Sequence, residues 1–281
     1  MPGLFEATAN HLRVAKRLVP RRGASFGERF GRLDDRFVFV VGSPRSGTTF
    51  LAGAIGSLPG FVDLGEVAPV KAAVPELAAL PPDDASIRLR RILALSRRVG
   101  LVGSVRAVEQ TPEMAFLVRA VPPAFPQARL VHIVRDGRDV VCSLLEQPWL
   151  RHDQRRADDA GVAYGAYARF WVEPERRAEF ETATDARRAA WVWRSYLTAA
   201  RRGDVHELRY EDMVADPARV GSELAKYLGS SPEPLVAALG SAHGRSIGRY
   251  ERELTDEKLA DVEEEAGQLL RELGYVSSAS A

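Results

Sequence analysis

The loop at residues 42–49, GSPRSGTT, contains the residue types and spacing best suited to bind a phosphate-like group. Gly42 and Gly47 lack side chains that would block a close backbone approach, and a helix beginning after the loop directs free N–H groups at an anion. The glycine spacing is that of the nucleoside-triphosphate loop, G-x-x-x-x-G-K-[ST], but Thr48 occupies the lysine position. The cation is instead Arg45, inside the loop. The pattern therefore predicts a phosphate cradle whose ligand differs from an ordinary nucleoside triphosphate.

A second group of anion-binding residues follows the apolar run at 129–134, RLVHIV. Arg135 ends this run, and Ser143 lies one turn into a helix that we expect to begin near Val140. A guanidinium can donate two parallel hydrogen bonds to a phosphate, and a serine adds one more donor. His132, in the middle of the run, is more typical of a hydrogen-bonded core residue than of a catalyst. Two anion sites at neighbouring strand ends predict a ligand with two separate phosphate groups.

Glu66 is the candidate general base. It follows a short extended run at 61–64 and would lie at the same edge of the sheet as the loop if the connection is a right-handed crossover. From its position alone, it could equally be a surface residue that caps a helix. The polar run at 110–113 ends a short strand expected at 105–109, so its side chains would also face this edge.

These residues need a sheet to bring them together. The run at 37–41, FVFVV, has no polar alternation, which indicates a central parallel strand covered on both faces. The segment after Thr48 places apolar residues at helical spacing, and further strands are expected at 129–134 and 205–210. Ligands of such open sheets gather at the carboxyl ends of the strands. We predict an α/β fold of three layers, P-loop-like, with a central, mainly parallel sheet flanked by helices.

The chain of 281 residues, 46% of them hydrophobic, is long enough for one large domain, which we place at 35–281. Residues 1–34 are expected to form a helical arm packed on this domain or, alternatively, a membrane-surface helix. Residues 68–104 are expected to be helical and peripheral, broken at Pro75 and again at 81–84. The irregular segment 147–185 is either a substrate lid or a solvated connection.

Composition excludes several classes of function. The net charge of +1 gives no reason to expect nucleic-acid binding. The single cysteine, Cys142, cannot form an internal disulfide or build a cysteine zinc site, which suits a reducing, cytoplasmic location. No run approaches the roughly 20 apolar residues that span a bilayer, and no signal peptide is evident. We expect no metal site.

With these features in place, the sequence resembles the sulfotransferases that use 3′-phosphoadenosine 5′-phosphosulfate (PAPS), especially bacterial members and the tyrosylprotein and glycan branches. Residues 42–49 are similar to the family's 5′-phosphosulfate loop, and residues 135–143, RDGRDVVCS, to its 3′-phosphate motif, with Arg135 and Ser143 at the family's spacing. Residues 208–214 and 248–275 resemble further family segments. The likeness covers about residues 36–276.

The resemblance implies roles for individual residues. Glu66 would be the general base, and Arg45 would act in catalysis as well as in binding. Tyr210 would lie beside the adenosine, and Arg249 would close over the phosphates. The residues implied to bind the donor are Pro44, Arg45, Ser46, Gly47, Thr48, Thr49, Arg135, Ser143, Tyr210 and Arg249.

The implied reaction is in-line transfer of a sulfonate to an acceptor hydroxyl or amine, leaving 3′,5′-ADP. The acceptor could be a glycan, a lipid, a small-molecule natural product or a peptide tyrosine. Relatives commonly have lysine at the position of Gln110, so the charge of the sulfonate would be stabilised by Arg45 or by another arginine. The alternatives are a P-loop nucleotide or small-molecule kinase, disfavoured by the missing loop lysine, and a non-catalytic nucleotide-binding protein.

Overall fold

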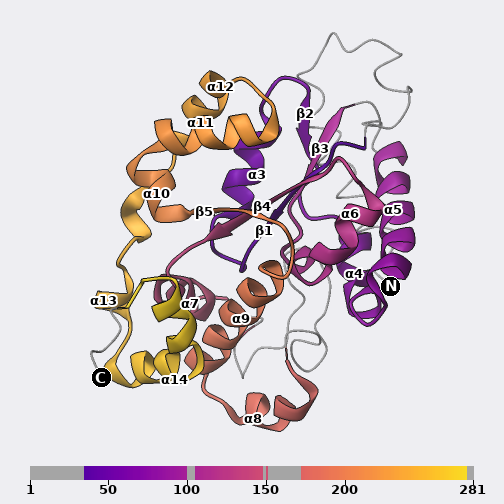
Figure 1. The fold of residues 1–281 in the computed structure, drawn as a ribbon. Coiled ribbons are helices and arrows are strands. Elements are labelled where there is room, and N and C mark those ends of the chain that lie inside the picture. Colours follow the sequence, from indigo (N-terminus) through magenta and orange to yellow (C-terminus); the bar gives the residue numbers. More distant parts are fainter. Residues whose placement is uncertain (1–34, 100–104, 148–149, 151–171, 277–281) are drawn as a thin grey trace.

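A five-stranded parallel sheet forms the centre of the protein (Figure 1). The computed structural model describes residues 35–99, 105–147, 150 and 172–276. The strands are arranged in the order β2-β3-β1-β4-β5, and every pair of neighbours is parallel. Their bounds are β1 Val38–Val41, β2 Phe61–Asp63, β3 Arg106–Glu109, β4 Arg129–Val134 and β5 His206–Arg209. The predicted fold class is confirmed.

Both faces of β1 are buried, as its apolar sequence requires. Phe39 and Val41 belong to the larger core, whereas Val38 and Val40 belong to a second core on the opposite face. The two sets alternate along the strand because successive side chains of a strand point to opposite faces. Each face of the sheet therefore needs its own cover of helices.

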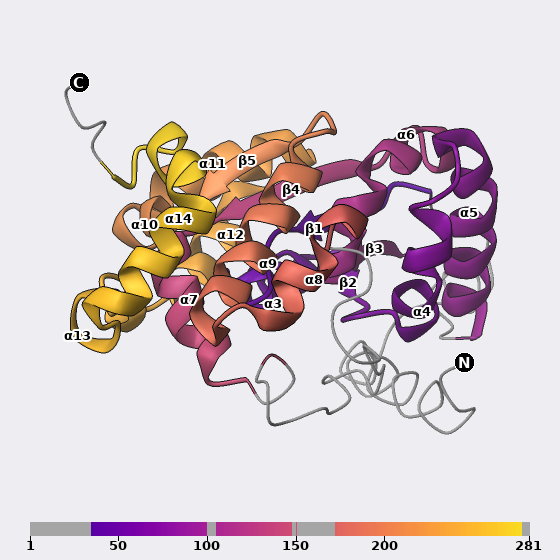
Figure 2. The same cartoon turned by 90° about the horizontal axis from the view of Figure 1, so that it is seen from below.

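Figure 1 shows the two helical layers on either side of the sheet, and Figure 2 views the molecule from the side of α9 and α14. One layer contains α3 Thr48–Gly56, α10 Tyr210–Ala215, α11 Pro217–Leu228 and α12 Pro232–Leu239. The other contains α4 Ala68–Leu77, α5 Pro82–Val99, η1 Pro112–Ala120, α6 Val121–Ala124, α7 Gly137–Leu145, α9 Asp185–Ala200 and α14 Asp256–Glu272. Shorter elements are η2 Pro174–Arg176, α8 Arg177–Thr182, η3 Gly244–Ser246 and α13 Tyr250–Glu253.

The order of the strands marks the carboxyl end of β1 as the place where a ligand would bind. From β1 the chain proceeds to β2 and β3 on one side, and then crosses to β4 and β5 on the other. Connections that leave neighbouring strands toward opposite sides open a space beyond the strand ends, where ligands of open α/β sheets bind. The loop after β1 and the turn after β4 flank this position.

Two local expectations were wrong, and a third is confirmed. Helix α7 begins at Gly137 rather than near Val140, because Asp136 caps it by accepting a hydrogen bond from the Arg138 N–H at 2.9 Å. Pro75 does not break α4, which ends two residues later, so that only its last turn lacks a hydrogen bond. The expected break at 81–84 is confirmed by the start of α5 at Pro82.

Residues 112–120 form a 3₁₀ helix, η1, followed by the short α-helix α6. At the junction Val121 donates to the carbonyl of Val118, three residues earlier, whereas Pro122 and Pro123 have no N–H to donate. The N-terminal arm at 1–34 and most of the segment at 147–185 lie outside the described residues.

Candidate active site

The loop between β1 and α3 is shaped by close contacts that only glycine permits. A Cβ atom on Gly47 would lie 2.9 Å from the ring of Tyr210, and the φ angle of Gly47 is +99°. A Cβ on Gly42 would lie 2.6 Å from the carbonyl oxygen of Ile133 on β4. Arg45, at the tip of the loop, has a φ of +71°, an uncommon conformation for a residue with a side chain. The loop is therefore fixed against β4 and Tyr210, with the exposed Arg45 side chain projecting from it.

The structure brings the two predicted anion sites into direct contact. Arg45 Nε donates to Ser143 Oγ at 3.0 Å, and Arg135 Nη1 donates to the backbone carbonyl of Arg45 at 3.3 Å. The Arg135 guanidinium lies 4.8 Å from the centre of the Tyr210 ring. These four residues come from the first loop, the end of β4, α7 and the start of α10. The sequence predicted that Arg45, Arg135 and Ser143 lie at neighbouring strand ends, and the family resemblance implied that Tyr210 lies beside the same ligand.

Two buried donors at these sites have no hydrogen-bond partner among the described residues. They are Ser46 Oγ, in the first loop, and Arg135 Nε. Buried polar groups in proteins are nearly always hydrogen-bonded, so each of these two donors could bind an acceptor supplied by a ligand. A ligand carrying phosphate or sulfate oxygens has the right chemistry.

Glu66 is connected to the first loop through the end of β3. Thr49 donates to the Gln110 side-chain oxygen at 3.2 Å, and the next residue, Thr111, accepts from the backbone N–H of Val67 at 3.0 Å. The Glu66 carboxylate, one-quarter exposed, contacts Lys71 Nζ at 2.8 Å. The structure thus places Glu66 and the loop threonines on the same polar stretch at the sheet edge.

Arg249 lies on the C-terminal segment, where it pairs with carboxylates. Its guanidinium contacts Glu253 at 2.6 Å and also Glu146. The backbone beside it is held by Asp139 of α7, whose oxygens accept from the N–H groups of Gly248 at 2.8 Å and Tyr250 at 3.1 Å. The carbonyl of Ser246 in the same segment accepts from Arg135 Nη2 at 2.5 Å. This segment is therefore tied to the second anion site, while the Arg249 side chain itself points to two glutamates.

Sequence reasoning missed the residues that support Arg135. Trp193 of α9 donates from its indole nitrogen to the Arg135 carbonyl at 3.1 Å, and a Cβ on Gly137 would lie 2.7 Å from the Trp193 ring. Trp191 and Trp193 are both fully buried. The glycine within RDGRD was a signal that another group approaches the turn closely.

Burial changes the proton affinity of several carboxyl groups near the site. Burial, together with the negative charge of Glu66, raises the pKa of Glu109 to about 8 against two lowering hydrogen bonds from Thr111. Burial also raises the pKa of Asp139, although the N–H groups of Tyr250 and Gly248 oppose the shift. The sheet edge is thus poorly hydrated, and charge–charge interactions there are stronger than in water.

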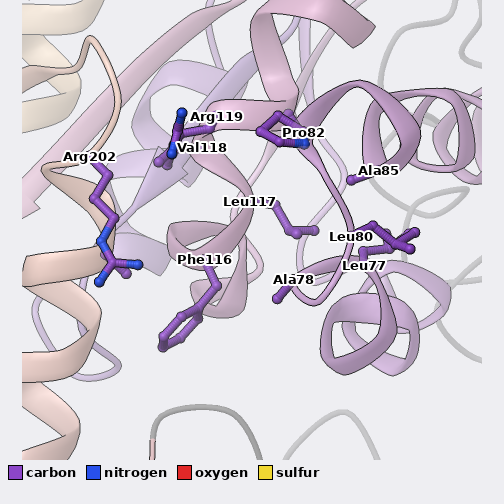
Figure 3. Close-up of a pocket in the computed structure, with 12 residues that line it drawn as sticks. Leu77, Ala78, Leu80, Pro82, Ala85, Phe116, Leu117, Val118, Arg119 and Arg202 are labelled. Carbon is purple, nitrogen blue, oxygen red and sulfur yellow. The ribbon is translucent and has the colours of Figure 1, made fainter. Parts of the chain in front are cut away.

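A cavity of about 160 Å³ lies elsewhere, between the end of α4, the start of α5, η1 and the end of α9 (Figure 3). Leu77, Leu117 and Phe116 contribute to its lining, with Arg119 and Arg202. It is smaller than the roughly 300 Å³ at the lower end of ligand pockets, and none of its lining residues belongs to the predicted donor site. It is not a nucleotide site.

Comparison with known protein families matches residues 81–234 to a sulfotransferase family. The matched region is more than half of the chain. The chain belongs to the sulfotransferase family. No curated protein sequence matches this chain.

Solved structures show the same fold. The sulfotransferase domain of the olefin synthase of Synechococcus PCC 7002 is 17% identical, with a TM-score of 0.50 over 90% of this chain and 100% of that domain. Sulfotransferase STF9 from Mycobacterium avium is 15% identical, with a TM-score of 0.50 over 96% of this chain and 84% of that protein. Within the described part of this sulfotransferase, no helix has the length and hydrophobicity to cross a membrane.

Proposed function

We propose that this sulfotransferase transfers the sulfonate of PAPS to an acceptor hydroxyl or amine and releases 3′,5′-ADP. The observation that carries the proposal is the contact between two anion sites, formed by the Arg45–Ser143 hydrogen bond and by the Arg135–Arg45 hydrogen bond. PAPS has phosphate groups at two separate positions of one nucleoside. A nucleoside triphosphate, with its phosphates in one chain, has no group for the second site.

The proposed donor-binding roles are those that the family resemblance implies, and the geometry supports them. The residues proposed to bind the 5′-phosphosulfate are Pro44, Arg45, Ser46, Gly47, Thr48 and Thr49. Arg135 and Ser143 are proposed to bind the 3′-phosphate, and the orphaned Arg135 Nε and Ser46 Oγ fit acceptor oxygens at these two sites. Tyr210, packed between Gly47 and Arg135, is proposed to lie beside the adenosine.

Arg249 is proposed to act differently from the other arginines. Its guanidinium is paired with Glu146 and Glu253, so it would have to leave these partners to close over the phosphates. Breaking these ion pairs costs little free energy, because both glutamate side chains are exposed and ion pairs at a protein surface contribute little stability.

In the proposed reaction Glu66 accepts the proton of the acceptor hydroxyl or amine. The acceptor atom forms a bond to sulfur as the bond from sulfur to the bridging oxygen breaks, and the electron pair leaves with 3′,5′-ADP. As in phosphoryl transfer, the protein contributes positioning and electrostatic stabilisation. Arg45 supplies positive charge, and Gln110, held by Thr49, supplies an amide donor where relatives have lysine.

The remaining parts of the proposal concern the context of the reaction. We propose that residues 35–281 form the catalytic domain, with 1–34 as an arm, and that the protein acts in the cytoplasm on a glycan, lipid, small-molecule or peptide-tyrosine acceptor. Membership of the sulfotransferase family favours sulfonate transfer over the kinase alternative, as does the absence of a lysine at position 48.

Ligand binding provides the first test. We expect 3′,5′-ADP to raise the melting temperature of the protein by several degrees at 1 mM, and ATP to raise it far less. Arg135→Ala should weaken 3′,5′-ADP binding at least tenfold, since a hydrogen bond to a charged group contributes about 1.5–3 kcal/mol. Arg119→Ala, in the separate cavity, is the matched control. Equal stabilisation by ATP, or unchanged affinity in Arg135→Ala, would reject the two-phosphate site.

Transfer of ³⁵S from labelled PAPS provides the second test. Glu66→Gln should lower transfer by a factor of about 10² to 10⁴, the range for loss of a general base, and leave 3′,5′-ADP affinity unchanged. The assay uses a panel that contains a phenol, a monosaccharide, a fatty alcohol and a tyrosine peptide. Full transfer activity in Glu66→Gln would show that the base is another residue.

A further inference from the structure

Lys71 is a buried lysine in contact with Glu66, the proposed general base. It lies on α4, and its ammonium group is 2.8 Å from Glu66 Oε2 and 3.5 Å from Glu113 Oε1. Its side chain is only 5% exposed. A lysine is rarely buried unless it is paired, because removing its charge from water is costly. A buried lysine in contact with the proposed general base requires a reason.

The contact with Lys71 holds one oxygen of Glu66 in place. Lys71 binds Oε2, and the Glu66 side chain remains one-quarter exposed. The backbone next to Glu66 is also anchored, because the Val67 N–H donates to Thr111. A carboxylate held at its backbone and at one oxygen has a defined orientation, as proton abstraction requires.

Glu113 gives Lys71 a second counter-ion. The Glu113 side chain is 1% exposed, and its Oε1 also accepts from the hydroxyl of Tyr196 on α9 at 3.2 Å. When Glu66 takes up a proton, its negative charge disappears. With Glu66 as its only partner, the buried ammonium would then be left without a negative charge beside it. With Glu113 in place, the ion pair of Lys71 persists in both protonation states of Glu66.

Other charged groups near this cluster do not replace Lys71. On β3, Glu109 is fully buried and bonded to Thr111, and it is negative or neutral. On β2, Asp63 accepts from the Gly65 N–H at 2.7 Å. On α5, which packs against α4, Arg88 pairs with Glu76, and Arg90 pairs with Asp35 at exposed positions. Lys71 is thus the cation placed directly on Glu66 among these neighbours.

We propose that Lys71 is a positioning residue for the general base, which holds Glu66 ionised and oriented while Glu113, fixed by Tyr196, serves as its permanent counter-ion. The proposal rests on the proposed role of Glu66. It gives α4 and η1 a role in orienting the general base, separate from donor binding. It also places a lysine beside the reaction in a chain that has Gln110 where relatives have lysine.

The test measures ionisation of Glu66 without needing an acceptor. In protein labelled with ¹³C at the glutamate carboxyl groups, the Glu66 resonance is identified by its absence in Glu66→Gln, and its titration midpoint is followed from pH 3 to 9. Lys71→Met should move the midpoint upward by about one unit, because an adjacent cation favours the ionised form. Lys71→Arg should restore it. Glu113→Gln should move it downward, because it removes a negative charge that competes with Glu66 for Lys71.

Controls separate this proposal from the proposed function. Lys226→Met removes an exposed lysine of α11 and should leave the midpoint unchanged. All variants should bind 3′,5′-ADP with unchanged affinity, which excludes damage to the fold or donor site. If Lys71→Met is unstable, the double variant Lys71→Met/Glu113→Gln removes one charge of each sign and should still move the midpoint upward.

The outcomes are distinguishable. An unchanged midpoint in folded Lys71→Met, or shifts of the same sign in Lys71→Met and Glu113→Gln, overturns the role of Lys71 whatever the activity of Glu66→Gln. Full ³⁵S transfer by Glu66→Gln overturns the base assignment even if the midpoints move as expected. Opposite shifts together with loss of transfer in Glu66→Gln support both.

Discussion

Glu109 illustrates how the sheet edge controls protonation at a single residue. It ends β3, one residue before Gln110, and its side chain is fully buried. Its Oε1 accepts from the Thr111 N–H at 2.9 Å, whereas Oε2 has no partner among the described residues. Because its pKa is raised to about 8, the carboxyl group retains its proton at neutral pH. Glu66, the proposed base, then has one negative neighbour fewer.

The raised pKa predicts a loss of stability with increasing pH. The unfolded carboxyl group releases its proton near pH 4.5, but the folded one releases it only near pH 8, so between these values the folded state binds more protons. The free energy of unfolding therefore falls through this window and levels off above pH 8. Glu109→Gln keeps the oxygen that accepts from Thr111 but cannot ionise. We expect its melting temperature to match that of the parent protein at pH 5 and to exceed it by several degrees at pH 9.

Thermal unfolding of both proteins at pH 5, 7 and 9 checks this expectation. Glu257→Gln, at an exposed position in the first turn of α14, is the control for loss of a glutamate charge. A difference between Glu109→Gln and the parent that is the same at pH 5 and pH 9 would show that Glu109 does not carry the pH dependence.

At the scale of elements, α7 and α9 pack against each other through Gly137 and Trp193. The Trp193 ring of α9 lies against Gly137 at the start of α7, and its indole N–H binds the carbonyl of Arg135. The turn that carries Arg135, the proposed ligand of the 3′-phosphate, is thus shaped by a residue 58 positions later in the chain. Packing of α9 and binding of the 3′-phosphate should therefore depend on the same contact.

Gly137→Ala tests this dependence. The added Cβ would lie 2.7 Å from the Trp193 ring, so the ring or the turn must shift. We expect a loss of about 1–3 kcal/mol in the free energy of unfolding, the usual cost of overpacking, together with at least threefold weaker 3′,5′-ADP binding. Gly53→Ala in α3 is the matched control, because its Cβ would meet no atom within 4 Å and alanine favours a helix. Stability should be measured by urea unfolding and affinity by calorimetry; unchanged values for Gly137→Ala would contradict the close contact.

The elements that could be predicted from the sequence are those with uniform local patterns. The apolar runs of β1 and β4 indicated buried parallel strands, and the glycine spacing indicated the loop between β1 and α3. The grouping of Arg45, Arg135 and Ser143 then followed from the rule that ligands lie at strand ends. The parallel sheet and this grouping are both present in the structure.

The supporting contacts could not be predicted, because they join elements that are distant in the sequence. Lys71 is one of only four lysines in the sequence and the only basic residue of α4. Its place among apolar residues indicated a buried charge but not which residue pairs with it. Its pairing with Glu113, and the contact of Trp193 with Gly137, depend on how α4, η1, α7 and α9 pack. Periodicity fixes which face of a helix is buried but not which residue of another helix meets it.

At the scale of the whole molecule, the C-terminal end of the described chain returns to the starts of α7 and α10. Tyr275 donates to Glu211 at 3.0 Å, and Glu211 in turn accepts from the Asp136 N–H at 2.9 Å. Arg138 donates to the Tyr275 carbonyl at 2.9 Å. The start of α7 is therefore bound by residues from the end of the described chain. Donor binding and the order of the C-terminal segment should be coupled through α7.

Asp139→Asn tests this coupling. Asp139 accepts from the N–H groups of both Gly248 and Tyr250, whereas an asparagine side chain has one oxygen and would oppose one N–H with its own amide hydrogens. We expect hydrogen exchange in peptides that cover 248–253 to accelerate about tenfold, because loss of a charge-assisted bond costs about 1.5–3 kcal/mol. Binding of 3′,5′-ADP should weaken severalfold, since Ser246 in this segment accepts from Arg135.

Hydrogen exchange measured by mass spectrometry, with and without 3′,5′-ADP, shows whether Asp139→Asn affects donor binding or only loosens residues 248–253. Asp256→Asn, at an exposed position in the first turn of α14, should leave exchange in 248–253 and 3′,5′-ADP affinity unchanged. In the parent protein, 3′,5′-ADP should slow exchange of these peptides, because ligand on Arg135 favours the state in which the segment is docked. Faster exchange in Asp139→Asn with parental affinity would show that the segment covers α7 without contributing to donor binding. Slower exchange on ligand binding in the parent, lost in Asp139→Asn, would show that α7 transmits the binding of the donor to the C-terminal segment.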